Sequence, residues 1–559
     1  MHFDSFARLA FALGVAALTL GAFTASERDI RRAAESISEA SYRNLIAGLS
    51  ADDLEGREPG TVGEQRTIEY LEEQFLELGL QPVTGGSFRQ DVPLVDITAT
   101  EAKLSFRKGA GGMDLAFGDD MVLGTRRVRS ESSVTDSEVV FVGYGIVAPE
   151  YGWNDYAGLD MRGKTALILV NDPGFVTGEA DLFRGKAMTY HGRWTYKFEE
   201  AARQGAAAAI IIHDTAPAAY DWTVVRNGWS GSQFYMDSAD GNATSTALQG
   251  WITHDRARQL MEMAGQDLTA LEAAAVKRGF RAVPLGVQAS GGVRNQIRRM
   301  KSPNLAAVMP GKDRPDEYVV YMAHWDHLGM TDGAAEDRIV NGAVDNATGV
   351  AGILTIAQGF RSLLPGPSRS ILFLAVTAEE SGLIGSEFYA QKPLVPLEKT
   401  AAVFNIDALN PLGRAKDIEV IGFGASELED LLAKAAKAQG RTLTPDRRSE
   451  AGYFYRSDHF NFAKAGVPAL YIKSGTELRD QPPGTGLARY DEYYALNYHK
   501  PSDEYQDSWD VSGSIEDLRL LFEVGAKVAN SGKWPDWYEG NEFRAVREAS
   551  AKSRAAEEK

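Results

Sequence analysis

The second half of the chain alternates apolar strands with helices, and this rhythm limits the folds that it can adopt. Predicted strands cover residues 318–323, 370–376, 401–406 and 467–472, and a predicted helix runs from Asp345 to Leu364. Strands that alternate with helices in this way form largely parallel sheets. We therefore expect an α/β fold, with a mixed, mostly parallel sheet flanked by helices.

Five residues with metal-binding side chains stand at or near the ends of these elements. They are His324, Asp345, Glu380, Asp407 and His499. In parallel sheets, ligands bind beyond the carboxyl ends of the strands, and three of the five positions lie there. Two imidazoles and three carboxylates form a mixed nitrogen and oxygen set, which favours zinc or a related divalent ion over calcium or magnesium.

Each of these positions also has an ordinary explanation when it is taken alone. Asp345 suits the cap of a helix, and acidic residues such as Glu380 suit a first helical turn. Asp407 suits a turn, and His499 lies in a loop rich in Tyr, Pro and Asp. Five such residues in this order, three of them at strand ends, make a joint coincidence a poor explanation. The sequence therefore predicts a metal site.

Two further carboxylates accompany the candidate ligands. Asp326 follows His324 by two residues, and because a metal-bound imidazole usually donates its other N–H to a carboxylate, the side chain of Asp326 is the candidate partner of His324. Glu379 stands beside Glu380 without being needed as a ligand, and a hydrolase needs such a carboxylate as general base. His327 is a rival ligand, but no carboxylate follows it two residues later.

The bulk properties exclude several classes of protein. At 559 residues the chain is too long for one compact core, so we expect two or three domains. The net charge of −18 argues against nucleic acid or an anionic membrane as a partner. The chain has no cysteine, so it has neither disulfides nor a thiolate metal site.

The N-terminus has the features of an export signal. Residues 9–23 form an apolar run that ends near Thr24, Ala25 and Ser26, and this length suits a signal peptide better than a spanning helix. We expect a signal peptide over residues 1–26 and a periplasmic or extracellular protein. The alternative is a retained membrane anchor, since Asp4 offsets Arg8 ahead of the run.

The middle of the chain contains none of the five candidate ligands. Its predicted strands cover residues 138–145, 164–170 and 206–212, and its three histidines have no metal-binding spacing. We expect an inserted domain there. The expected division places one domain in residues 27–128 and 297–535, the insert in 129–296, and a polar tail in 536–559, which we expect to be a solvated helix or disordered and to have no function.

These motifs together resemble the M28 family of co-catalytic zinc metallopeptidases, the aminopeptidase and glutamate-carboxypeptidase-like group. The resemblance is close over residues 300–510 and looser over 54–80, and it implies the zinc exopeptidase fold with two zinc ions per chain. The family pattern assigns His324 and Asp407 to one zinc, and Glu380 and His499 to the other. Asp345 bridges the two ions, and Glu379 is the general base.

The resemblance implies further features. Residues 302–311 resemble the opening strand of the family, and residues 456–459 resemble a segment near its substrate pocket. The insert resembles a protease-associated domain. The family also implies a cis peptide bond between Asp345 and Asn346.

The function implied by the resemblance is hydrolysis of peptide substrates by an activated water, with an aminopeptidase as the first expectation. Tyr455 and Tyr498 are candidates for the oxyanion site, and Arg456 is a candidate for substrate binding. A carboxypeptidase is the alternative, because Arg456 or Lys473 would suit a substrate carboxylate. A single-zinc acyltransferase or cyclase and a non-catalytic receptor also stay open, although all five ligands and Glu379 are intact. The sequence predicts no oligomeric state.

Overall fold

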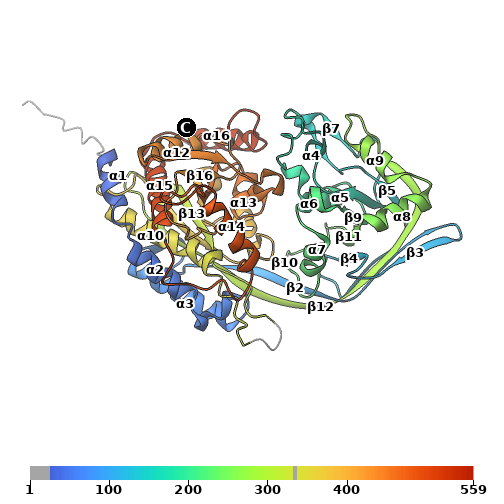
Figure 1. The fold of residues 1–559 in the computed structure, drawn as a ribbon, viewed down its shortest axis with the longest axis horizontal. Helices are drawn as coiled ribbons and strands as arrows, with labels where there is room; N and C mark the ends of the chain where they lie inside the picture. The colour runs from blue at the N-terminus through green and yellow to red at the C-terminus, as the bar shows by residue number, and fades with distance from the viewer. Residues whose placement is uncertain (1–24, 332–335, 558–559) are drawn as a thin grey trace, which may run out of the picture.

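The structure, a computed structural model, describes residues 25–331 and 336–557 of the chain. The predicted signal peptide lies almost entirely outside these residues. Figure 1 shows two halves, one made of the N-terminal helices and the C-terminal part of the chain, the other of its middle. None of the helices within the described ranges has the length and apolar character needed to cross a membrane.

The first half contains the α/β sheet that the sequence predicts. Four strands are parallel: β13 (Arg314–His324), β14 (Arg369–Val376), β15 (Thr400–Asn405) and β18 (Ala469–Ser474). β16 (Asp417–Val420) pairs antiparallel with β18 and parallel with β17 (Thr442–Pro445), and β12 (Val283–Met309) pairs antiparallel with β14. The sheet is therefore mixed and mostly parallel, as expected.

Helices cover both faces of this sheet, because side chains alternate along each strand. Tyr321 packs into the core on one face, whereas Val320 and Met322 pack on the other. The first core includes α1 (Glu27–Ala34), α2 (Glu39–Leu49), α3 (Val62–Glu77), α10 (Thr348–Ser362), α12 (Leu428–Ala438) and α15 (Ser512–Asn530). The second core includes residues of α11 (Ile384–Gln391) and α13 (His459–Lys464). A further helix, α14 (Thr485–Leu496), precedes α15 in the chain.

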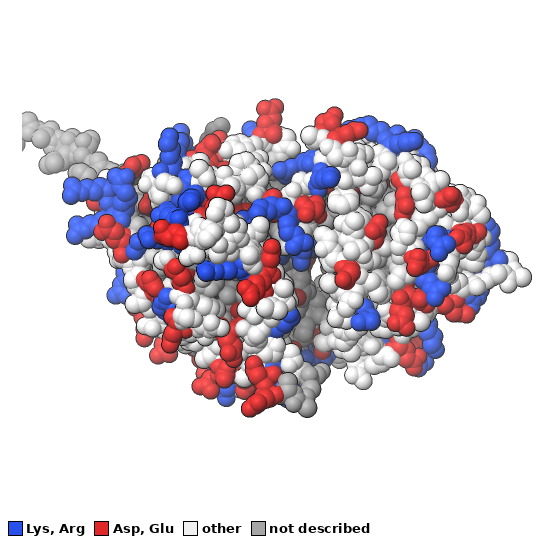
Figure 2. Space-filling model, in the orientation of Figure 1, with Lys and Arg blue, Asp and Glu red and all other residues white. Residues whose placement is uncertain are grey.

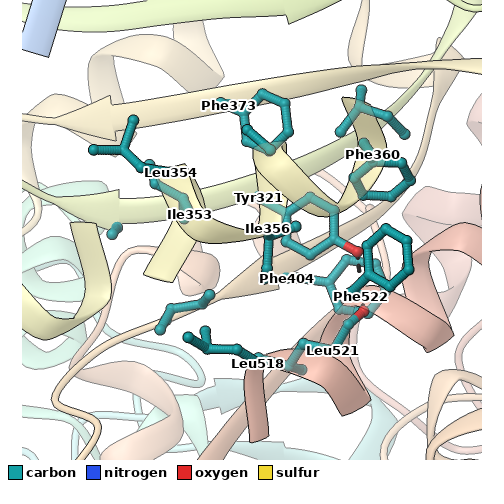
Figure 3. Packing of buried hydrophobic residues seen from close by; sticks show 14 of the residues in the cluster. Tyr321, Ile353, Leu354, Ile356, Phe360, Phe373, Phe404, Leu518, Leu521 and Phe522 are labelled. Atoms are coloured by element: carbon teal, nitrogen blue, oxygen red, sulfur yellow. Dashed lines mark hydrogen bonds between the residues drawn. The ribbon is translucent and has the colours of Figure 1, made fainter. Parts of the chain in front are cut away.

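Tyr321 fills the centre of the first core, as Figure 3 shows. Its ring stacks on Phe404 and Phe373, with ring centres 5.0 Å and 6.0 Å apart. Its hydroxyl donates a hydrogen bond of 2.9 Å to the carbonyl of Leu521 on α15. A Cβ atom at Gly525 would lie 1.8 Å from this hydroxyl. Glycine at this position therefore lets α15 approach the sheet closely.

The middle of the chain forms a second parallel sheet with its own cores. The strands β5 (Glu131–Phe141), β8 (Thr165–Leu169), β9 (Ala208–His213) and β11 (Leu248–Thr253) are parallel, and β4 (Met121–Gly124) closes the edge antiparallel. Its helices are α4 (Pro173–Thr177), α5 (Trp194–Arg203), α6 (Thr215–Ala218), α7 (Trp222–Gly228), α8 (His254–Ala264) and α9 (Leu268–Ala275). Leu104 and Phe106 also pack into this core. Residues before 129, the expected start of the insert, therefore contribute to this half as well.

Two long antiparallel strands join the halves. β2 (Arg89–Lys108) pairs with β12 over almost its whole length, and the ribbon runs along one side of both halves (Figure 1). β12 continues into the first sheet through β14 and into the second through β5. The short strands β1 (Gln81–Pro82), β3 (Gly111–Leu115), β6 (Val147–Ala148), β7 (Trp153–Asn154) and β10 (Phe234–Met236) complete the architecture.

The C-terminal segment forms a helix, which is one of the two expected alternatives, but buried residues anchor the segment to the fold, and this corrects the expectation of a merely solvated tail. Trp537 is fully buried and donates through its ring N–H to the carbonyl of Gly466 at 3.0 Å. α16 (Arg544–Glu557) is held by Arg547, whose buried guanidinium donates to the carbonyls of Thr400 and Ala401. The polar composition of the tail concealed one buried arginine, which satisfies buried carbonyls at the start of β15.

Candidate metal centre

The structure brings the five predicted ligands together beyond the carboxyl ends of the parallel strands. His324 ends β13, Glu380 follows β14, and Asp407 follows β15. Asp345 comes from the segment before α10, and His499 comes from the loop after α14. This is the edge of the sheet at which ligands of parallel α/β folds bind.

Asp345 lies between two clusters of ligands. Its Oδ1 is 3.2 Å from His324 Nε2, which is 3.6 Å from Asp407 Oδ1. Its Oδ2 is 3.3 Å from His499 Nε2, which is 3.2 Å from Glu380 Oε2. One carboxylate thus serves both clusters, and each cluster adds one imidazole and one further carboxylate.

The donor atoms are arranged as metal ligands. Nε2 of His499 is buried and has no hydrogen-bond partner, although two carboxylate oxygens lie close to it. Single donor atoms of His324, Asp345 and Asp407 lie within 4.8 Å of one another, and those of His327, Asp345 and Glu380 do the same. A divalent cation that prefers nitrogen and oxygen ligands fits this set.

The electrostatics agree with a cation site. Burial opposes the protonation of His324, yet the Glu379, Asp345 and Asp407 carboxylates raise its pKa well above the ordinary value. Against the same effect of burial, Glu380 and Asp345 raise the pKa of His499 to about 11. The cluster has more negative charge than its imidazoles balance, so positive charge is stabilised in it.

Asp326 is placed differently from the prediction. His324 Nδ1 lies 3.1 Å from the backbone carbonyl of Asp326 and 3.8 Å from its carboxylate. The carboxylate instead accepts the backbone N–H groups of Glu379 at 3.1 Å and Glu380 at 3.4 Å. Asp326 therefore ties the end of β13 to the Glu379–Glu380 turn, while its carbonyl faces the ring of His324.

His327 belongs to the same site. Its Nδ1 lies 2.6 Å from Glu380 Oε1, and its Nε2 is buried without a hydrogen-bond partner. From the sequence, His327 is only a rival ligand, because no carboxylate follows it two residues later. Its partner comes from the next strand, and only the parallel pairing of β13 with β14 reveals the contact.

Asp345 and Asp407 are held by neighbouring polar groups. The Asp503 carboxylate accepts the backbone N–H of Asp345 at 3.2 Å. Asn346 accepts the N–H of Ala408 and donates to the carbonyl of Ile406, at 3.1 Å each. The peptide bond between Asp345 and Asn346 is cis, as the resemblance implies. Asp345 has non-helical backbone angles, and α10 begins only at Thr348, so Asp345 is not a simple helix cap.

The candidate substrate residues lie at different places. Tyr498 stacks on the ring of His499 with centres 3.8 Å apart, so it borders the metal cluster. The hydroxyl of Tyr455 donates to Glu542 at 2.9 Å. Lys473 donates to the Tyr494 hydroxyl at 3.0 Å and lies over the ring of Tyr453. Its ammonium is already engaged, whereas Arg456 is exposed.

A second arginine accompanies Arg456 from the other half of the molecule. Burial and the neighbouring guanidinium of Arg456 lower the pKa of Arg193 to about 10. Nε of Arg193 is buried without a hydrogen-bond partner, and Tyr220 interacts with both arginines. Figure 2 shows a hollow between the two halves, with Lys and Arg side chains at its rim.

Comparisons with known proteins agree with the geometry of the site. Residues 304–522 match the model of Peptidase family M28. The aminopeptidase NAALADL1 of Mus musculus is 35% identical over 129 residues, which are 22% of this chain and 16% of that protein. A probable lipoprotein aminopeptidase, LpqL of Mycobacterium tuberculosis, is 28% identical over 209 residues, 34% of this chain and 40% of its own.

Other similar proteins are a glutamate carboxypeptidase 2 homolog and a solved aminopeptidase. The homolog, from Caenorhabditis elegans, is 25% identical over 200 residues, which are 34% of this chain and 24% of that protein. The aminopeptidase, from Aneurinibacillus sp. strain AM-1, is 20% identical with a TM-score of 0.48, covering 90% of this chain and 96% of that one. The chain spans less than half the length of each of these curated relatives.

Proposed function

We propose that this chain, whose residues 304–522 match the model of Peptidase family M28, is a member of that family and a metal-dependent exopeptidase, in the first place an aminopeptidase. The observation that carries the proposal is the shared carboxylate of Asp345, which faces one imidazole with each oxygen. A carboxylate oxygen of Glu379 lies within 4.8 Å of ligand atoms of His324 and Glu380, and we assign Glu379 a role other than that of a ligand because the five-residue ligand set is complete without it.

The described residues would hold two zinc ions. His324 and Asp407 would bind one, Glu380 and His499 the other, and Asp345 both. Two such ions would activate a water molecule and polarise the scissile carbonyl. The Ser457 hydroxyl donates to the second oxygen of Asp407 at 2.6 Å, and His327 contacts the second oxygen of Glu380. These contacts fix the orientation of both ligands.

Glu379 would move the protons of the reaction. Burial raises the pKa of Glu379 well above its ordinary range, and the neighbouring Glu380 and Asp407 carboxylates add to the shift. Such a carboxylate accepts a proton readily, so it would take one from the attacking water and return it to the leaving amine. The contact of Asp326 with the Glu379 backbone N–H fixes the turn that carries it. Tyr498, beside His499, would supply a donor to the developing oxyanion.

The experiment that tests this function replaces Glu379 by glutamine. Glu379→Gln should lower kcat by about 10²–10⁴-fold, while elemental analysis still finds two metal ions per chain. Glu387→Gln, on the outer side of α11, is the matched control and should keep wild-type turnover. Near-normal kcat in Glu379→Gln would contradict its role, and one ion or none in active protein would contradict the two-metal site.

A carboxypeptidase is the second candidate, and the two arginines favour it. Among the residues that the structure describes, neither Arg193 nor Arg456 forms an ion pair, and the two guanidinium groups lie close enough to interact with each other. A substrate carboxylate would pair with such guanidinium groups. Assays of aminoacyl anilides against N-acylated dipeptides would separate the two directions. Cleavage of the N-acylated substrates alone would establish the carboxypeptidase.

Two other parts of the proposal concern metal count and location. A single-zinc acyltransferase or cyclase would contain one ion and would leave peptides intact, so metal analysis and the same substrate panel distinguish it. We also propose export to the periplasm or the extracellular space, from the apolar run over residues 9–23. N-terminal sequencing of the protein from its host would show cleavage near residue 26, or its absence in an anchored protein.

A further inference from the structure

Arg57 is a buried cation that contacts the loops of the metal centre from outside residues 304–522. It ends the short 3₁₀ segment Asp52–Arg57, and its side chain is only 1% exposed. No carboxylate lies within ion-pair distance of it among the described residues. A buried charge without an ionic partner is expensive, so the fold must satisfy this guanidinium in another way.

Four backbone carbonyls surround the guanidinium. Nε donates to Trp325 at 2.9 Å, and Nη2 donates to Gly342 at 3.0 Å. Nη1 donates to Leu49 at 2.7 Å and to Asn341 at 2.5 Å. Trp325 separates His324 from Asp326, whereas Asn341 and Gly342 lead into Asp345. One side chain therefore fastens the end of β13, which carries His324, to the loop that leads into Asp345.

Neighbouring backbone contacts strengthen this connection. The N–H of His327 donates to the carbonyl of Arg57 at 3.3 Å, and the N–H of Gly329 donates to Gly56 at 2.9 Å. A Cβ atom at Gly56 would lie 2.3 Å from the carbonyl of Gly329. Glycine is required there, because residue 56 also has a φ of 68°. The segment thus lies against the loop after β13 too closely for another side chain.

The charge of Arg57 also faces the acidic site. Burial lowers the pKa of Arg57 to about 10, while Asp326, Asp345 and Asp503 oppose this shift. The guanidinium is still protonated at neutral pH. It therefore reduces the repulsion among the carboxylates around the two metal positions.

We propose that Arg57 is a positioning residue of the metal centre, which holds the loops of His324 and Asp345 at the separation that two metal ions require. This inference rests on the proposed metal-dependent function, and it extends the site to the N-terminal segment. Contacts that orient metal ligands typically change metal affinity by about 10–100-fold when they are removed. Loss of Arg57 should therefore weaken metal binding before it abolishes folding.

The test compares Arg57 with a matched arginine. Arg369 is fully buried and likewise donates to carbonyls, those of Val528, Ser531 and Lys533, but it lies at the opposite end of β14. Cobalt(II) is titrated into metal-free wild type, Arg57→Ala, Arg57→Lys and Arg369→Ala, and the visible absorption spectrum and the dissociation constant are recorded. Urea unfolding of each variant measures stability separately.

We expect Arg57→Ala and Arg57→Lys to weaken cobalt binding at least 10-fold and to alter its spectrum, because lysine cannot reach four carbonyls. Added guanidinium should partly restore the affinity of Arg57→Ala. Arg369→Ala should lose stability and keep the wild-type cobalt affinity. If Arg57→Ala does not fold, Arg57→Lys decides alone. Wild-type affinity in Arg57→Lys would overturn the inference, whereas a wild type that binds no cobalt would overturn the proposed function instead.

Discussion

Replacing Gly349 by alanine would test how the fold positions Asp345 and Asp407. Gly349 lies in the first turn of α10, and a Cβ atom there would lie 2.2 Å from Asn346 Oδ1 and 2.3 Å from the carbonyl of Ile406. Asn346 directly follows the proposed ligand Asp345, and Ile406 directly precedes the proposed ligand Asp407. The same Asn346 oxygen accepts the N–H of Gly349 at 2.9 Å, so the added methyl group would displace the group that joins the two loops.

The sign of the effect follows from comparing magnitudes. Alanine in a helix is favoured over glycine by about 1 kcal/mol. Overpacking costs about 1–3 kcal/mol, and the three hydrogen bonds of Asn346 contribute about 0.5–1.5 kcal/mol each. The contacts therefore outweigh the helix propensity, and with all three hydrogen bonds lost Gly349→Ala should lower the free energy of unfolding by about 1.5–6.5 kcal/mol. Metal affinity should fall as well, since both ligand loops shift.

Gly359→Ala in the same helix is the control. Its added Cβ would meet the movable rings and methyl groups of Phe522 and Ile37 at 3.0–3.3 Å, far from the metal ligands along α10. Urea unfolding of the metal-free proteins and zinc titration give both quantities. Equal stability and equal zinc affinity in the Gly349 and Gly359 variants would refute the reasoning.

Three further outcomes are expected. Chelation of the metal should lower the melting temperature, because an ion at about 100 times its Kd stabilises the folded state by about 2.7 kcal/mol; an unchanged melting temperature would exclude tight binding. Burial raises the pKa of Asp155 to about 7, above its unfolded value, so the stability from its bound proton is full below about pH 4 and is lost as pH rises through 7. Asp155→Asn loses one of the hydrogen bonds that the carboxylate accepts from Ile146 and Trp153, so the variant should be less stable than the wild type. The difference in unfolding free energy between the two proteins should shrink as the pH rises from about 4 to about 7.5, and a constant difference would contradict this pKa. Arg547→Ala should cost about 2–4 kcal/mol by leaving buried carbonyls unsatisfied and should expose α16 to proteases, with no change in metal content; a protease-resistant variant would show that α16 has another anchor.

The catalytic sheet was predictable because its signals are local. Continuous apolar runs identify β13, β14 and β15, and each ends at a ligand or beside one. The convergence of these strand ends then follows from parallel pairing. The resemblance supplied the roles of Glu379 and Asp345, which no spacing rule distinguishes from those of other acids.

The features that escaped the sequence depend on contacts between distant segments. Only the end of β12 was expected, within residues 302–311; its earlier residues alternate polar and apolar side chains without a continuous apolar run, and their pairing with β2 joins residues about 200 positions apart. Arg57 reads as one charge in a turn-rich loop, and only the structure shows the four carbonyls around it. Arg547 likewise is one of many charges in a polar tail. Burial of a single arginine leaves no periodic pattern to detect.

The ribbon of β2 and β12 makes the inserted half the connection of one very long β-hairpin. Ile97 pairs with Ile297 and Thr98 with Gln296, so the chain leaves the catalytic half and returns to it at neighbouring positions. A two-residue turn would bridge that gap, and the cost of closing a loop grows only slowly with its length. The architecture therefore permits exchange of the middle segment while the sheet that carries the proposed metal centre keeps its register. Variation between relatives of this design is expected to concentrate beyond this point of the hairpin, where a different segment can be inserted without rebuilding that sheet.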